Sequence, residues 1–226
     1  MGLPPLHVLY EDNHLLAVAK PAGLPTMGVA LGKPSLLEQA RQYVKHRYRK
    51  PGHVYLGVMS RLDAPVTGVV LLARTSKAAR RLTEQFRTHA VRKIYWAVVE
   101  GAMPPAAAEC VDWLGHDERR RRMHVVGPGF PGAQEARMAY RRLKPLDGLW
   151  LLEVELQTGR KHQIRLQLAS RGWPVLGDRK YGSRRPFAPG IALHARQLRI
   201  SHPTTGELVV FQAPVPASWR ALGLSD

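Results

Sequence analysis

Residues 60–74 of the chain read SRLDAPVTGVVLLAR. An Arg-Leu-Asp triplet leads through a loop that contains Pro and Gly into an apolar run from Thr67 to Ala73. A near-continuous apolar run of this length is typical of a strand that is buried on both faces. The carboxylate of Asp63 would then lie at the mouth of that strand, where a rigid scaffold often positions functional loops. The stretch alone leaves two interpretations open, a satisfied surface turn or a catalytic carboxylate.

The segments around this strand predict a single α+β domain over residues 1–226. Strands are expected at residues 7–10, 15–19, 93–100 and 152–156, and a hairpin is expected from residues 191–201 and 208–212. Three helices are expected, one from the capping box Ser35–Glu38 to about Tyr48, one capped by Ser76, and one over residues 161–171. Residues 101–132 are rich in Pro, Gly and Arg and predict loops with short strands. We therefore expect a mixed, largely antiparallel sheet with flanking helices.

Composition bounds the class of protein. The chain has 226 residues, of which 45% are hydrophobic, so it can bury a sizeable core. Its start lacks the basic and apolar regions of a signal peptide, and no apolar run is long enough to cross a membrane. Cys110 is the only cysteine, which leaves no internal disulfide and no cysteine-based metal cluster. These features predict a cytoplasmic protein without a membrane partner.

The charge of the chain is strongly positive. It has 34 Lys and Arg residues against 17 acidic residues, a formal net charge of +17. Such an excess favours a polyanionic partner, most commonly nucleic acid. The alternative is that the charge only keeps the protein soluble, or reflects replacement of Lys by Arg in a GC-rich genome. The candidate phosphate contacts are Arg80, Arg81, Arg119–Arg122, Arg141 and Arg142.

A second basic stretch, residues 156–165, reads LQTGRKHQIR. It predicts that a strand ends at Thr158 and Gly159 and that a helix begins there. The start of a helix favours anions, and Arg160, Lys161 and Arg165 would add positive charge. Lys161 and Arg165 are four residues apart and would share one helix face. The alternative is a solvated basic face.

Several familiar catalytic motifs are absent from the sequence, including the P-loop, the Gly-x-Ser-x-Gly elbow and the histidine zinc patterns. Other short motifs follow one another in a recognisable order: Glu11-Asp12 with KPAG at 20–23, RLD at 61–63 with Thr67-Gly68, Lys93-x-Tyr95, GRKHQIR at 159–165, GDxxYG at 177–182, LHA at 193–195 and His202-Pro203. In this order the chain resembles the RluA family of RNA pseudouridine synthases, over about residues 7–216.

The resemblance implies a pseudouridine synthase core with a mixed sheet and a central cleft. It also implies that uridine in structured rRNA or tRNA is isomerised to pseudouridine, with no cofactor and no metal. The first core strand begins near His7, so we expect a stand-alone catalytic domain without the S4 RNA-binding module of many relatives. We further expect a monomer whose partner is RNA.

The family's site residues map onto this sequence at three catalytic positions. The resemblance gives Asp63 the role of the catalytic carboxylate, as either a nucleophile or a base. It places Arg165 opposite Asp63 and gives Tyr95 the task of stacking on the uracil and helping to move the C5 proton. Arg61 would help to occupy the space that the flipped base vacates. The expected RNA-binding residues are Arg61, Arg160, Lys161, Arg80, Arg81 and Arg141.

Two residues beside Asp63 depart from the family's usual pattern, Ser60 in place of His and Val66 in place of Thr. They bear on the contacts of the flipped nucleotide and on the choice of substrate. An alternative function is a catalytically silent RNA-binding or RNA-chaperone module on the same fold. A third alternative is a basic scaffold for protein partners.

Overall fold

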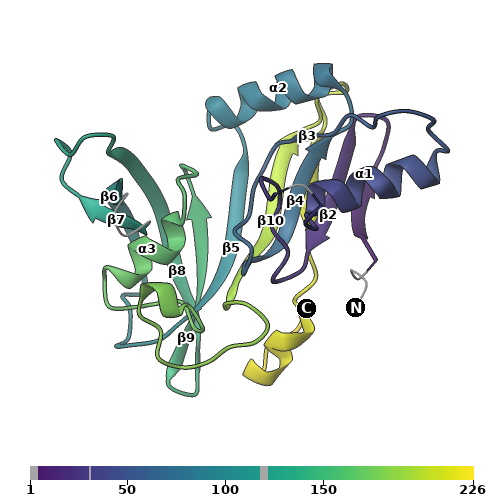
Figure 1. Cartoon of the computed structure of the whole chain (residues 1–226). Helices are drawn as coiled ribbons and strands as arrows, with labels where there is room; N and C mark the ends of the chain where they lie inside the picture. Colours follow the sequence, from purple (N-terminus) through teal and green to yellow (C-terminus); the bar gives the residue numbers. More distant parts are fainter. Residues whose placement is uncertain (1–4, 31, 118–121) are drawn as a thin grey trace. The chain divides into compact units, whose positions relative to one another are not determined.

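The computed structural model describes residues 5–30, 32–117 and 122–226. These residues form two compact units (Figure 1). Unit 1 contains the chain up to Val91 together with Ala195–Val215, and unit 2 contains Arg92–His194 together with Pro216–Asp226. The α+β class is confirmed, whereas the assignment of one catalytic domain to the whole chain stays a prediction. Within the described residues, no helix combines the length and apolar character needed to span a membrane.

Unit 1 is built on a sheet in the order β1-β2-β4-β10. Its strands are β1 (His7–Glu11), β2 (Leu15–Lys20), β3 (Gly57–Val58), β4 (Thr67–Ala73), β10 (Leu193–Ser201, from Ala195 onward) and β11 (Leu208–Gln212). Strand β3 pairs with β4 and β11 pairs with β10, both antiparallel. All seven residues of β4 are buried, which confirms the strand predicted from residues 67–73.

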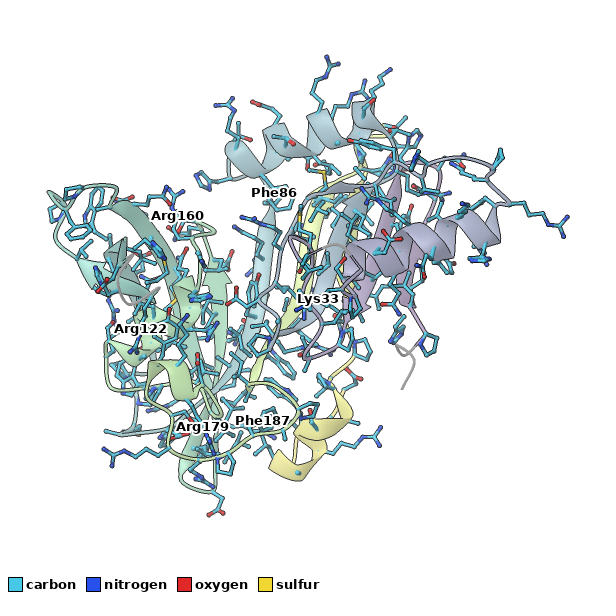
Figure 2. All side chains as sticks on the ribbon, viewed as in Figure 1. Lys33, Phe86, Arg122, Arg160, Arg179 and Phe187 are labelled. Carbon is cyan, nitrogen blue, oxygen red and sulfur yellow. The ribbon has the colours of Figure 1, made fainter. Side chains whose placement is uncertain are left out.

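Helix α2 (Ser76–Arg87) covers one face of this sheet. Val69, Leu71 and Ala73 of β4 belong to the same apolar cluster as Leu82, with Phe86 packed against it (Figure 2). The alternate residues of β4 point to the other face, and they are buried as well. Both faces of β4 are therefore covered, as expected for a continuous apolar run.

Gly68 in β4 has φ +119°, and a Cβ atom there would collide with the backbone carbonyl of Ala195 in β10. A residue without a side chain is therefore required where β4 meets β10.

The starts of the two helices of unit 1 follow the capping rules. Helix α1 (Leu36–Arg47) is capped by Ser35, whose side chain accepts from the backbone N–H of Glu38, as predicted. Helix α2 is capped by Thr75 and not by Ser76, because the Ala78 N–H donates to Thr75 Oγ1 at 3.1 Å. Thr75 has the extended backbone that a capping residue needs, whereas Ser76 already belongs to the helix.

Unit 2 is an antiparallel sheet in the order β5-β9-β8-β6-β7. Its strands are β5 (Arg92–Val99), β6 (Ala107–Asp117), β7 (Arg122–Val126), β8 (Gln134–Leu146) and β9 (Leu149–Leu156). Residues 101–132 are therefore more regular than predicted, because the prolines lie outside 107–117 and leave that segment able to pair. Arg119–Arg121 lie outside the described residues.

The helices of unit 2 are short. They are α3 (Gln163–Ala169) and the 3₁₀ turns η1 (Arg179–Tyr181) and η2 (Ala217–Leu222). The expectation that Lys161 and Arg165 share a helix face is wrong, because His162 is left-handed with φ 58° and the helix begins only after it. The anion site expected at the helix start stays a prediction. The Gln163 side-chain oxygen accepts there from the Thr158 hydroxyl and from the Arg160 N–H.

The capping assignment gives a direct test on α2. Thr75→Ala removes the acceptor for the Ala78 N–H and is expected to lower the free energy of unfolding by about 1 kcal/mol. Ser76→Ala is the matched control, expected to change stability by less than about 0.5 kcal/mol. Urea unfolding of both variants measures the difference. A larger loss for Ser76→Ala would overturn the assignment.

Candidate active site

The Asp63 loop is first anchored to β4 by the residues that precede it. The Met59 N–H donates to the Leu71 carbonyl at 2.9 Å, and the Leu71 N–H donates to Ser60 Oγ at 3.0 Å. Ser60, one of the two departures from the family pattern, therefore bonds to the central strand of unit 1. Its hydroxyl fixes the point at which the chain leaves the sheet.

The segment between β2 and α1 holds the same loop on both sides of Asp63. Thr26 Oγ1 donates to the Leu62 carbonyl at 2.8 Å and accepts from the Leu62 N–H at 3.1 Å. On the other side, the Ala64 carbonyl accepts from the Gly23 N–H at 2.8 Å and from Lys20 Nζ at 3.0 Å. The backbone is thus fixed immediately before and immediately after Asp63.

Lys20 is almost completely buried, at 2% relative exposure, although it carries an amine. Its Nζ donates to the carbonyls of Pro21, Leu24 and Ala64 at 2.8–3.0 Å. Burial lowers the pKa of Lys20 to about 7, and the negative charge of Asp63 opposes this shift. Each N–H of the ammonium form therefore has one carbonyl acceptor. Lys20 therefore both bonds to the loop, at Ala64, and interacts electrostatically with the Asp63 carboxylate.

Asp63 itself opens a tight turn. Its carbonyl accepts from the Val66 N–H at 3.0 Å, its side chain is half-buried, and Val66 is buried. Arg61, two residues earlier, is exposed. The arrangement presents a carboxylate on a fixed backbone next to an exposed guanidinium residue, which suits a loop that binds or transforms a polar substrate.

Arg165 is the best-defined cation of unit 2. It is 5% exposed and makes two bonds to Asp178, from Nε at 2.6 Å and from Nη2 at 2.9 Å. The guanidinium carbon also lies 5.0 Å from the centre of the Tyr181 ring. The Tyr181 hydroxyl lies 2.7 Å from His162 Nδ1. The direction of Arg165 is therefore set by a bidentate pair and an aromatic face.

Tyr95 lies on β5, where it pairs with Val154 of β9 and is half-buried. Lys93, two residues before it, shares its strand face. Lys93 Nζ donates to the Thr158 carbonyl at 3.2 Å. Burial lowers the pKa of Lys93 to about 8, and the charge of Arg160 adds to the effect. Tyr95 therefore lies on a strand face that also carries a lysine with a lowered pKa.

The predicted RNA-binding arginines are all exposed, but they differ in their partners. Arg80 and Arg81 lie on α2, and Arg81 Nη1 donates to the Pro203 carbonyl. Arg160 Nε donates to the Glu135 carbonyl, and its side chain is labelled in Figure 2. Arg141 forms an ion pair with Glu153 across the sheet at 2.7 Å. Lys161 is exposed just before α3.

The predicted catalytic residues are divided between the two units. Asp63 belongs to unit 1, whereas Tyr95 and Arg165 belong to unit 2. Their grouping in one cleft stays a prediction, as do their roles. In the part of the chain that the structure describes, no three His, Cys, Asp or Glu side chains are grouped to hold a metal ion.

Sequence reasoning missed two residues that organise the candidate site, Lys20 and Asp178. Both belong to motifs that the sequence displays, KPAG and GDxxYG. Each is a charged residue inside a short motif that contains Pro or Gly. Because charged side chains are seldom buried unless they are paired, the sequence shows the motif but not the burial.

Comparison with known proteins identifies the family. A model of the RNA pseudouridylate synthase family matches residues 14–170, which include the Asp63 loop, β5 and α3. The chain belongs to the RNA pseudouridylate synthase family. Its members are isomerases that act on uridine in RNA, and the RluA-type resemblance is confirmed.

The chain is similar to several named proteins over most of its length. It is 34% identical to an uncharacterised RNA pseudouridine synthase from Synechocystis, over 96% of this chain and 68% of that protein. It is 35% identical to ribosomal large subunit pseudouridine synthase D from Nitrosomonas europaea, of whose length it spans 64%. It is 32% identical to tRNA pseudouridine synthase C from Salmonella typhimurium, over 95% of this chain and 87% of that one.

A solved structure supports the fold. Human RNA pseudouridylate synthase domain containing 4 superposes with a TM-score of 0.78 at 26% identity, covering 97% of this chain and 94% of that chain. The synthase fold is therefore the one that the sequence motifs predict.

The buried Arg165–Asp178 pair should dominate the stability of the synthase domain around α3. Asp178→Ala leaves a buried guanidinium without its bidentate partner and is expected to cost about 3–5 kcal/mol in the free energy of unfolding. The matched control is Glu153→Ala, which breaks the exposed pair with Arg141 and should cost at most about 1 kcal/mol. Unfolding in guanidinium chloride measures the loss of stability of each variant. Equal losses would contradict the importance of burial.

Lys20 should give the stability of the synthase domain a specific pH dependence. Its pKa of about 7 lies below the ordinary value of 10.5, so between these values the unfolded chain binds more protons and stability rises with pH. Lys20→Met lacks this rise and leaves buried carbonyls without donors, at a cost of roughly 2–4 kcal/mol. Urea unfolding at pH 7 and pH 9 should show the gap between wild type and variant widening. A constant gap would contradict the lowered pKa.

Proposed function

We propose that this chain converts uridine to pseudouridine in structured RNA and that Asp63 is the carboxylate that drives the reaction. The observation that carries the proposal is the Asp63 loop itself. The loop lies within the family match, and its backbone is bonded at Leu62 and at Ala64, on either side of the carboxylate. A group that must meet a sugar carbon or a sugar proton at a fixed distance requires such preorganisation.

The chemistry needs no external reactant. The bond between N1 of the base and C1′ of the sugar breaks, the base rotates, and a bond between C5 and C1′ forms. The proton of C5 is released, N1 gains a proton, and no electron is lost or gained. Asp63 either attacks C1′ or removes a sugar proton, and both routes need its ionised form. Arg165 is proposed to stabilise that charge.

Tyr95 and Arg61 are proposed to handle the base. A uridine inside a stacked structure must leave the stack before a carboxylate can approach its sugar. Tyr95 would stack on the extruded uracil and help the C5 proton to leave, while Arg61, exposed beside Asp63, would fill the vacated space. Contacts with the RNA backbone are assigned to Arg80, Arg81, Arg141, Arg160 and Lys161.

The proposed substrate is ribosomal or transfer RNA. Relatives similar to this chain along most of its length are named for each of these RNAs, a large-subunit rRNA synthase and a tRNA synthase. The strong positive charge fits either polyanion. We further propose that the chain works in the cytoplasm, as a monomer.

The activity can be tested with one carboxylate and one control. Asp63→Asn keeps the size of the side chain and removes its charge, and it is expected to lower pseudouridine formation by at least about 10²–10⁴-fold. Asp147→Asn is the control, because Asp147 lies in the turn after β8 with φ 40°, a conformation that Asn tolerates. Total RNA from cells that lack the gene is incubated with the wild-type protein or with each variant. Pseudouridine is then measured by carbodiimide primer extension.

Two results would overturn the proposal. Equal modification by wild type and Asp63→Asn would remove Asp63 from the chemistry. RNA binding without pseudouridine at any position would instead support the silent RNA-binding module.

A further inference from the structure

A basic surface runs along α1 and the turn that follows it, and it includes none of the residues assigned to RNA so far. We call it the α1 surface and define it by Arg41, Lys45, Arg49, Lys50, His53 and Tyr55. All six side chains are exposed and lie in unit 1. Between Gln39 and Leu62 the sequence contains no acidic residue, and Glu38 and Asp63 are the carboxylates that flank this stretch.

The α1 surface is hollowed rather than flat. One depression of about 630 Å³ is lined by residues that include Arg41, Lys45, His53 and Tyr55. A second, of about 750 Å³, is lined by residues that include Lys45, Arg49 and Lys50. Glu38, Gln42 and Lys45 line both depressions, which therefore adjoin each other, and we call the two together the groove. Glu38 is the one carboxylate among the lining residues, against Arg41, Lys45, Arg49 and Lys50. A groove in which cations outnumber carboxylates and which has one exposed aromatic ring is typical of surfaces that follow a nucleic acid strand.

Three cations of the α1 surface, Lys45, Arg49 and Lys50, have no carboxylate partner within the described residues, whereas Arg41 Nη1 lies 3.9 Å from Glu38 Oε2. Arg47, on the same helix, forms an ion pair with Glu11 at 3.2 Å. Other exposed arginines are paired as well, including Arg87 with Glu84 and Arg92 with Glu155. By contrast, within the described residues no carboxylate lies in ion-pair distance of Lys45, Arg49 or Lys50. The charges of these three residues therefore remain available to a polyanion.

Arg49 adds an observation that packing does not explain. Helix α1 ends with the Lys50 N–H bonded to the Lys45 carbonyl and with Arg49 in the left-handed region, at φ 48°. Helices that end in this way usually have Gly at that position, since Gly adopts positive φ without strain. This helix has an arginine at that position instead, and Arg49 is one of the residues that line the groove.

We propose that the α1 surface binds the backbone of an unpaired segment of the substrate RNA, outside the nucleotide that is modified. The inference rests on the proposed function for the identity of the RNA, but binding can be measured without turnover. Arg41 and Lys45 are one helical turn apart, about 6 Å along the axis, so they can meet successive phosphates. Tyr55, 51% exposed, offers a face on which one base can stack.

RNA fits this surface better than an acidic protein does. Phosphates follow one another at regular intervals along an RNA strand, as the cations follow one another along α1. The Tyr55 ring at the groove can stack on a nucleobase, whereas an acidic peptide would contact only the cations. Unpaired RNA is favoured over a duplex because only an unstacked base can reach Tyr55.

The test measures binding of short RNA by fluorescence anisotropy over a range of salt concentrations. The variant Lys45→Gln/Arg49→Gly/Lys50→Gln should weaken binding of an unstructured 12-nucleotide RNA and reduce the slope of log Kd against log salt by about 2, at about 0.7 for each phosphate contact. Arg49→Gly alone should lower the slope by about 0.7 while leaving the melting temperature unchanged or higher.

Matched variants separate the local site from the overall charge. Arg87→Gln removes one positive charge from α2, where Glu84 balances it, and should leave the slope unchanged. Arg49→Lys keeps the charge and should keep the binding. Tyr55→Ala should weaken binding of the single strand but not of a duplex of the same sequence.

Three outcomes would overturn the inference. The first is wild-type affinity and slope for the triple variant. The second is an equal effect of Arg87→Gln and Arg49→Gly, which would show that net charge alone matters. The third is displacement of the RNA by polyglutamate as efficiently as by RNA, which would favour an acidic protein. The failure of the proposed function would be seen separately, as absence of pseudouridine with RNA binding intact.

Discussion

The Nζ atom of Lys20 lies among three backbone carbonyls, and one of them belongs to the residue after Asp63. An ammonium buried at this depth is tolerated only because every N–H has an acceptor and because a carboxylate is nearby. The same contacts fix the loop that carries Asp63, and Thr26 fixes the residue before it. Burying the Lys20 ammonium is unfavourable, but its hydrogen bonds fix the backbone beside the Asp63 carboxylate. Strand β4 can begin from a fixed loop because Lys20 and the segment after β2 are bonded to that loop.

A similar exchange is made in unit 2. Arg165 is withdrawn from water and held by Asp178 through two bonds, with Tyr181 against its face. Its direction is thereby determined before any substrate arrives, which lowers the reorganisation that binding would require. Exposed pairs such as Arg141 with Glu153 have no comparable geometry and are screened by solvent. The chain thus uses its few acidic residues in two ways, to orient a buried cation and to neutralise cations at the surface. Where neither occurs, as at Lys45, Arg49 and Lys50, positive charge remains available to a polyanion.

Local patterns in the sequence predicted most of the elements correctly because the physics that forms them is local. The apolar run of β4 and the Ser35 cap each depend on residues within one strand or one turn. The errors arose where distant contacts decide. Helix α3 starts later than predicted because the Gln163 side chain accepts from Thr158 and Arg160, which no periodicity reports. Strand β6 is longer than predicted because pairing with β8 stabilises a segment whose flanks look irregular.

The sequence by itself determined the family, the carboxylate of Asp63 and the positive charge, since ordered motifs and composition are written in the residues themselves. The sequence also contains Lys20 and Asp178 within short motifs, but it does not show that they are buried. The tertiary structure decided that both are buried, which carbonyls Lys20 meets, and that Asp178 holds Arg165. It also decided that Arg49 takes a strained conformation at the edge of a groove. The reason is physical: burial and partnership depend on residues that are distant along the chain and that only folding brings together.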